Sequence, residues 1–89
     1  MLRITSRASH GAWTLELEGR LAGVWVEELR TAVASARTPA RGIRLRLSGL
    51  AFADEAGVDL LRSLRDDGVE LLDCSEFVVA LVDGGRGWL

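Results

Sequence analysis

Three carboxylates, those of Asp54, Glu55 and Asp59, are spaced closely enough to lie within about two turns of one helix. Such a group could hold a divalent cation or act as a general acid and base. Asp54, however, stands between an apolar stretch and a helical pattern, where aspartate typically serves as a helix N-cap. We therefore expect Asp54 to cap a helix and Asp59 to be solvated. No metal ligand or catalytic residue is predicted, because a chain of this length offers no deep cleft.

The other residue types that carry chemistry are isolated. Cys74 and His10 are the single cysteine and the single histidine, so neither an internal disulfide nor a zinc site is expected. We expect Cys74 to be a small buried residue and His10 to be solvated at a hairpin tip. The glycine-rich segment 84–87 precedes no helix and therefore lacks the context of a phosphate loop. No cofactor is predicted.

Composition indicates one globular domain. Hydrophobic residues make up 48% of the chain and charged residues 27%. The net charge is −2 and there is no basic block, so nucleic acid is not an expected partner. No apolar run reaches the ~18 residues that cross a bilayer, so we expect a soluble, cytoplasmic protein without membrane insertion. We place the domain at residues 2–83 and a flexible tail at 84–89.

Hydrophobic periodicity predicts four strands and three helices. Strands are expected at 2–6, 13–18, 42–48 and 69–73, the first two forming an antiparallel hairpin. Helices are expected at 24–37, from about residue 54, and at 76–82.

Three boundary features accompany these elements. Thr38-Pro39 should end the first helix, because the residue before a proline avoids the α region. An apolar loop should follow the third strand after Ser48-Gly49. Asp73 and Glu76 resemble a capping box for the last helix.

The third strand decides the architecture. Its apolar residues alternate with Arg44 and Arg46, whereas a parallel strand covered on both faces should be almost continuously apolar. Helices should therefore cover one face of a mixed sheet and leave the other exposed to solvent; we call this exposed face the wet face. If the second and third strands are neighbours, Glu16 and Glu18 can pair with the two arginines on this wet face.

Helical spacing also predicts which side chains face the core. The second helix should bury Gly57, Leu60, Leu61 and Leu64, and expose Asp59, Arg62, Ser63 and Arg65. In the first helix Trp25 should pack in the core. The first helix begins with three consecutive apolar residues, Val24, Trp25 and Val26. One face of a helix cannot bury all three, so at least one of them should face outward.

The order of these elements and the segment 47–57 resemble the STAS family, which includes anti-sigma factor antagonists and cytoplasmic domains of sulfate transporters. The matching positions of the family motif are Leu47, Ser48, Gly49, Phe52, Asp54, Ala56 and Gly57. Gly19-Arg-Leu21 also resembles the loop before the family's first helix. The likeness covers roughly residues 2–83 and implies an α/β, SpoIIAA-like domain with a mixed four-stranded sheet and about three helices on one face.

Three departures from the family pattern are visible. Glu55 occupies the position of the serine that a partner kinase phosphorylates in phospho-regulated members. Arg46 stands where an aspartate often precedes the leucine-serine pair, and the C-terminus leaves little room for a long final helix. Glu55 could stabilise its helix, present a fixed phospho-like charge, or form a salt bridge to a partner arginine. Each alternative excludes a serine phosphorylation cycle at position 55.

The resemblance implies a non-enzymatic protein-interaction module, an anti-sigma factor antagonist-like protein that acts in bacterial signal transduction and transcription regulation. Its partner would be a serine-kinase anti-sigma factor. An alternative role is the small cytoplasmic subunit that braces the ABC ATPase of a lipid-transport system, or a subunit of another signalling assembly. A second alternative is a small-ligand sensor. A homodimer is possible. The implied docking residues are Leu21, Ala22, Gly23, Phe52, Asp54, Glu55, Ala56, Gly57, Val58, Asp59 and Arg62.

Overall fold

The computed structural model describes residues 1–9, 11–36 and 42–84. The elements follow in the predicted order: β1 (Leu2–Ser9), β2 (Ala12–Leu21), α1 (Val24–Ala36), β3 (Gly42–Ala53), α2 (Glu55–Asp66), β4 (Glu70–Leu72) and α3 (Glu76–Gly84). The predictions for His10, Thr38-Pro39 and the tail after Gly84 lie outside the described residues.

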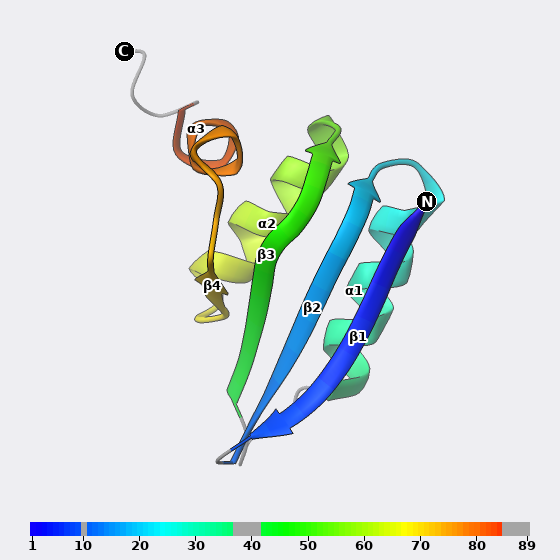
Figure 1. Ribbon diagram of the computed structural model, residues 1–89, viewed down its shortest axis with the longest axis vertical. Coiled ribbons are helices and arrows are strands. Elements are labelled where there is room, and N and C mark those ends of the chain that lie inside the picture. The colour runs from blue at the N-terminus through cyan, green and yellow to red at the C-terminus, as the bar shows by residue number, and fades with distance from the viewer. Residues whose placement is uncertain (10, 37–41, 85–89) are drawn as a thin grey trace.

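The four strands form one mixed sheet in the order β1-β2-β3-β4. β1 and β2 are antiparallel, whereas β3 runs parallel to β2 and to β4. Figure 1 shows α1 and α2 behind the sheet, with the opposite face of β1, β2 and β3 turned to the viewer. The predicted α/β fold, a mixed four-stranded sheet with helices on one face, is confirmed.

One apolar cluster fills the space between the sheet and the helices. Its fully buried leucines alternate along β2 and β3, as the period of a half-covered strand requires. α2 contributes the predicted Gly57, Leu60, Leu61 and Leu64. In α1, Trp25 packs partly buried against the cluster and Val24 points outward, 74% exposed, as expected for one of the three apolar residues.

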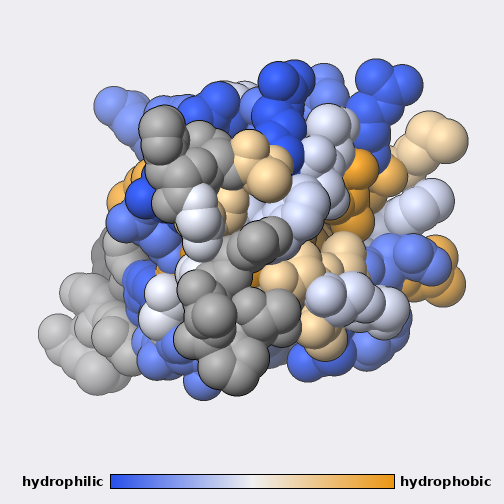
Figure 2. All heavy atoms as spheres, turned by 90° about the horizontal axis from the view of Figure 1, so that it is seen from below, coloured by the Kyte–Doolittle hydropathy of each residue, from blue (hydrophilic) through white to orange (hydrophobic). Residues whose placement is uncertain are grey.

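The wet face of the sheet carries one of the predicted charged pairs, that of Glu16 with Arg46, whereas Arg44 pairs with Glu70 of β4 instead of Glu16 or Glu18. Arg46 Nη1 lies 3.3 Å from Glu16 Oε2 across the β2–β3 pair, and Arg44 Nε lies 3.3 Å from Glu70 Oε2. Seen from the end at which the β1–β2 hairpin lies, hydrophilic residues line one side of the molecule (Figure 2). Among the described residues, no helix has the length and apolar character needed to cross a membrane.

β3 is longer than predicted, because the segment expected to be an apolar loop continues the strand to Ala53. The register between β2 and β3 shifts at Glu16/Glu18 and again at Gly19/Arg20. These irregularities change the phase of the alternation, so that Ser48 and Gly49 are both exposed before Leu50 returns to the core. A Cβ on Gly49 would lie 2.8 Å from Glu18 Cγ, so glycine permits this close approach.

The cap predicted for the last helix was also wrong. Ser75 Oγ accepts a hydrogen bond from the backbone N–H of Val78 at 3.2 Å, which makes Ser75 the capping residue of α3. Asp73 has a φ of 53° and its Oδ2 lies 3.1 Å from Arg46 Nε. Asp73 therefore belongs to a turn and an ion pair, and Cys74 beside it is half-buried against the core.

Candidate functional site

Asp54 is the N-cap of α2, as predicted. Its φ of −80° and ψ of −178° are extended, and its Oδ1 accepts the backbone N–H of Gly57 at 2.7 Å. Its Oδ2 accepts a second backbone N–H, from Gly23 in the loop before α1, at 3.0 Å. The bond from Gly57, and then the bond from Gly23, lower the pKa of the Asp54 carboxyl below its ordinary value of 3.8. Asp54 is therefore held as a carboxylate that joins two separate loops.

The end of β2 is fixed against the same residues. The backbone N–H of Asp54 donates to Leu21 O at 3.0 Å. A Cβ on Gly57 would lie 2.5 Å from Leu21 O and 3.3 Å from Asp54 Oδ1, so α2 approaches β2 in a way that requires glycine. Gly23, with a φ of 60°, makes the left-handed turn that aims its N–H at Asp54.

An exposed surface surrounds this junction at the end of the molecule where β2 leads into α1 and β3 leads into α2 (Figure 1). Glu55 and Ala56, in the first turn of α2, are exposed, and so are Gly23 and Val24 on the neighbouring loop and helix. The Arg20 guanidinium lies 4.7 Å from the centre of the half-buried Phe52 ring. We call the residues Arg20, Gly23, Val24, Phe52, Glu55 and Ala56 the α2 N-terminal surface.

Several residues expected to dock a partner are instead part of the fold. Leu21, Gly57 and Val58 are buried, so they offer little surface to a partner. Arg62 was expected to be exposed, but it is half-buried and donates to the carbonyls of Leu81 and Val82 at 2.9 and 2.7 Å. These carbonyls are near the end of α3, so Arg62 ties α3 to α2.

The other predicted docking residues are placed differently. Ala22 is half-buried beside the junction. Asp59 is exposed, as predicted, and its Oδ1 lies 3.6 Å from Arg62 Nη1. Asp59 and Arg62 therefore form a pair on the side of α2 that faces α3.

Two residues of the α2 N-terminal surface were absent from the predicted docking set. Val24 could have been included, because the run of three apolar residues already indicated an outward one. Arg20 is opposite Phe52 only because β2 and β3 pair beyond Gly49. No pattern in the sequence reveals that pairing, since the segment after Gly49 resembles a loop.

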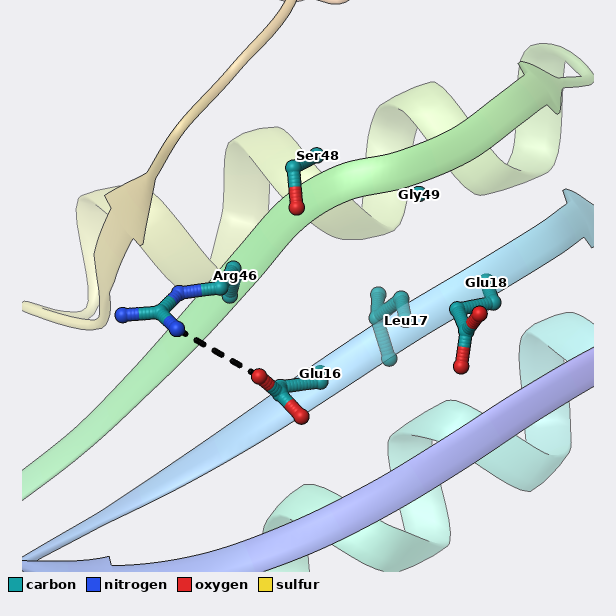
Figure 3. A pocket seen from close by; sticks show the side chains of 6 residues that line it. All are labelled: Glu16, Leu17, Glu18, Arg46, Ser48 and Gly49. Carbon is teal, nitrogen blue, oxygen red and sulfur yellow. Dashed lines mark hydrogen bonds and ion pairs between the residues drawn. The ribbon is translucent and has the colours of Figure 1, made fainter.

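A shallow polar pocket of about 260 Å³ lies on the wet face of the sheet. Glu16 and Arg46 face one another across it, with Glu18, Ser48 and Gly49 further along β2 and β3 (Figure 3). Glu16 also accepts from Arg7 Nε at 3.0 Å. The two side chains that face one another across the pocket, Glu16 and Arg46, are thus already engaged in ion pairs. Within the described ranges, no three His, Cys, Asp or Glu side chains gather as a metal-binding group.

A scan against models of protein families and a search of curated proteins found no match. Solved structures do match. A crystal structure of Mglu has a TM-score of 0.65 and 25% identity, and the match covers 81% of this chain but only 19% of that one. An antisigma-factor antagonist STAS domain from Rhodobacter sphaeroides has a TM-score of 0.57 and 22% identity, covering 80% and 83% of the two chains.

The anti-sigma factor antagonist SpoIIAA in its unphosphorylated form has a TM-score of 0.53 and 19% identity over 96% of this chain and 99% of its own. These likenesses establish that the chain has the fold of a STAS-like domain, as the resemblance in sequence predicted.

Proposed function

We propose that this chain is a non-enzymatic, anti-sigma factor antagonist-like module that binds a regulatory protein through the α2 N-terminal surface. The fold shared with two anti-sigma factor antagonist structures supports a role of this general kind. The presence of the same fold in one-fifth of a longer chain supports its use as a module.

The observation that carries the proposal is the double hydrogen bond of Asp54. By accepting from Gly23 and Gly57, one carboxylate fixes the loop before α1 against the first turn of α2. Two loops that are distant in sequence thus form one rigid surface. Binding to a preorganised surface costs less conformational entropy than binding to mobile loops.

The chemistry of this surface suits a protein partner. Val24 is 74% exposed and Phe52 is half-buried against Arg20, so the surface offers apolar as well as charged side chains. Interfaces commonly combine apolar or aromatic anchors with a polar rim. Glu55 adds a carboxylate at the positive end of the α2 dipole, which favours a basic group on the partner.

Glu55 also makes the proposed interaction constitutive. Glutamate has no hydroxyl, so this position cannot be phosphorylated, and its charge is present without a kinase. A serine-kinase anti-sigma factor that binds this chain would therefore be unable to release it by modifying residue 55.

The test is affinity capture of the tagged protein from its native cytoplasm, followed by titration of the identified partner. Val24→Asp and Glu55→Ser should each weaken binding by about tenfold, a loss of about 1.4 kcal/mol. Glu76→Ser is the matched control, because Glu76 is an exposed acid in the first turn of α3. It should change affinity less than twofold.

Equal effects of Glu55→Ser and Glu76→Ser would refute the special role of the α2 N-terminal surface. The identity of the partner separates the possible roles. A serine-kinase anti-sigma factor would support sigma-factor control, whereas an ABC ATPase would replace that role with a part in lipid transport.

A further inference from the structure

β1 is an edge strand of eight residues, and among the described residues only β2 pairs with it. The backbone N–H of Arg20 donates to Met1 O at 2.9 Å, which identifies Met1 and Arg20 as a hydrogen-bonded pair. Hydrogen-bonded and non-hydrogen-bonded pairs alternate along antiparallel strands. The odd-numbered residues of β1 therefore bond to β2, and the backbone groups of Leu2, Ile4, Ser6 and Ala8 point to the free edge.

A mostly apolar groove lies beside Ser6 of this edge, on the helix side of the sheet. It has a volume of about 340 Å³ and is lined by Ser6, Trp13, Ala32, Ser35 and Ala36. The groove exists because α1 packs against β2 and α2, and the residues of α1 that face β1 are small. A large apolar side chain on an added strand would fit between α1 and the edge of β1.

The other face of the same edge is basic. Arg3 and Arg7 are exposed and alternate with the residues that border the groove. Arg7 pairs with Glu16, whereas Arg3 is opposite Glu18 without an ion pair among the described residues. A second copy of β1 added antiparallel about Thr5 would place Arg3 opposite Arg7, and like charges directly opposite are destabilising. In this register the charge of the edge favours an acidic strand over a second copy of the chain.

We propose that the free edge of β1 binds an extended segment of a partner protein as a fifth strand. Acidic residues of that segment would face Arg3 and Arg7. The residues between them would point to the other face of the sheet, where an apolar one would occupy the groove over Trp13. An edge strand without proline or a bulge is a template for strand addition, and side chains on both faces then provide specificity. This interaction is distinct from the proposed role of the α2 N-terminal surface, since it uses the outer edge of β1, whereas that surface lies where β2 and β3 end.

The test selects peptides on the immobilised full chain. The probe is a pool of acetylated nonapeptides with Asp or Glu at every second position and Val, Leu, Ile or Phe between them, compared with a pool of shuffled sequence. The proposal expects enrichment of alternating peptides and amide chemical-shift changes at Leu2, Ile4, Ser6 and Ala8. No enrichment over the shuffled pool overturns it, and so do shifts confined to the α2 N-terminal surface.

Ser6→Pro gives the sharpest variant, because it removes an outward N–H and no bond to β2. It should weaken the selected peptide by about tenfold or more, whereas Ser6→Thr should change the affinity less than twofold. Arg3→Glu should weaken binding about fivefold, with a smaller effect at high salt. Equal binding to all three variants, or self-association of the chain through β1, would overturn the proposal.

A second measurement tests the proposal without any change to the protein, in case Ser6→Pro does not fold. The selected peptide is N-methylated on the alternate amides that would face β1 and titrated against the unmodified protein. Loss of binding supports strand addition, because only backbone donors of the peptide have been removed. Unchanged binding overturns it.

Discussion

Asp54 Oδ2 lies 3.0 Å from the backbone nitrogen of Gly23, which is 31 residues earlier in the chain. The bond joins the loop before α1 to the cap of α2, so one side chain sets the geometry of two loops. An aspartate at a helix start usually satisfies only the amides of its own helix. Here the second oxygen reaches another element, and the pair therefore controls the shape of the α2 N-terminal surface.

Two substitutions of Asp54 should distinguish the contribution of its bond to Gly23 from that of its bond to Gly57. Asp54→Ala loses both, lowers the melting temperature and speeds amide exchange at Gly23 and Gly57. Asp54→Asn keeps one acceptor oxygen for Gly57 but presents its NH₂ group to Gly23, so exchange should rise mainly at Gly23. Thermal unfolding and amide exchange check this order. Exchange at Gly57 that rises as much in Asp54→Asn as in Asp54→Ala would contradict it.

The lowered pKa of Asp54 predicts that the free energy of unfolding depends on pH. The folded pKa of Asp54 is below its ordinary value of 3.8, so the unfolded state binds the proton more tightly. The stability from Asp54 is therefore fully present above about pH 5 and is lost as the pH falls through 3.8 and the lower folded pKa. The difference in unfolding free energy between the wild type and Asp54→Asn should be constant from pH 5 to 7 and shrink below about pH 4. Urea titrations at each pH measure it, and a difference that persists undiminished at pH 2 argues against this assignment.

Gly57→Ala should destabilise the protein although alanine is the better helix former. Its Cβ would lie 2.5 Å from Leu21 O and 3.0 Å from Leu21 Cγ, so α2 or the end of β2 must move. Overpacking of this kind costs about 1–3 kcal/mol, which equals or exceeds the gain of about 1 kcal/mol in helix propensity. Chemical denaturation measures the net loss.

Gly42→Ala is the control for this substitution. A Cβ on Gly42 meets no atom within 4 Å, so the free energy of unfolding should change by less than about 0.5 kcal/mol. If Gly57→Ala were neutral or stabilising, the close approach of α2 to β2 would not be required.

Arg62→Met should loosen α3. The variant loses the hydrogen bonds that the guanidinium donates to the carbonyls of Leu81 and Val82. We expect a loss of about 1–2 kcal/mol, and faster amide exchange in α3 than in α1. Arg30→Met, which breaks only an exposed pair with Glu27, should cost less than about 0.5 kcal/mol. Equal losses in the two variants would mean that Arg62 is not a tie between the helices.

The sequence predicted the order of the elements and most of the core, because these depend on local periodicity. The alternation along β3 alone indicated that one face of the sheet is wet, and the apolar run before Leu29 indicated that Val24 or a neighbour faces outward. Asp54 was identified as a cap because aspartate at a helix start has a local reason to be there. Its bond to Gly23 has no such local signal.

Three of the errors share one physical cause, which is that contacts between distant elements override local patterns. β3 continues to Ala53 because β2 pairs with it after a register shift, although its own sequence resembles a loop. Val58 lies at the edge of the apolar stripe of α2, and it is buried because α2 packs against the rest of the core at that position. The position of Arg62 in the helical pattern predicts a solvent-exposed side chain, but the terminal carbonyls of α3 lie beside Arg62 and accept its hydrogen bonds.

Arg46 should stabilise the wet face of the sheet through both of its neighbours. Its guanidinium lies 3.3 Å from Glu16 Oε2 and 3.1 Å from Asp73 Oδ2, linking β2, β3 and the turn before α3. The group is partly exposed, so Arg46→Gln should cost only about 0.5–1 kcal/mol, and about half of that in 1 M salt. Urea unfolding at the two salt concentrations measures both values.

Arg46→Asp gives the stronger test, because an acid is often found at this position in the family that the sequence resembles. In this chain the new carboxylate would face Glu16 and Asp73, placing three acids together on one surface. Arg46→Asp should therefore cost about 1 kcal/mol more than Arg46→Gln, and the addition of Glu16→Gln should recover part of that loss. If the two Arg46 variants were equally stable, the arginine would owe its place to packing of its aliphatic stem and not to its charge.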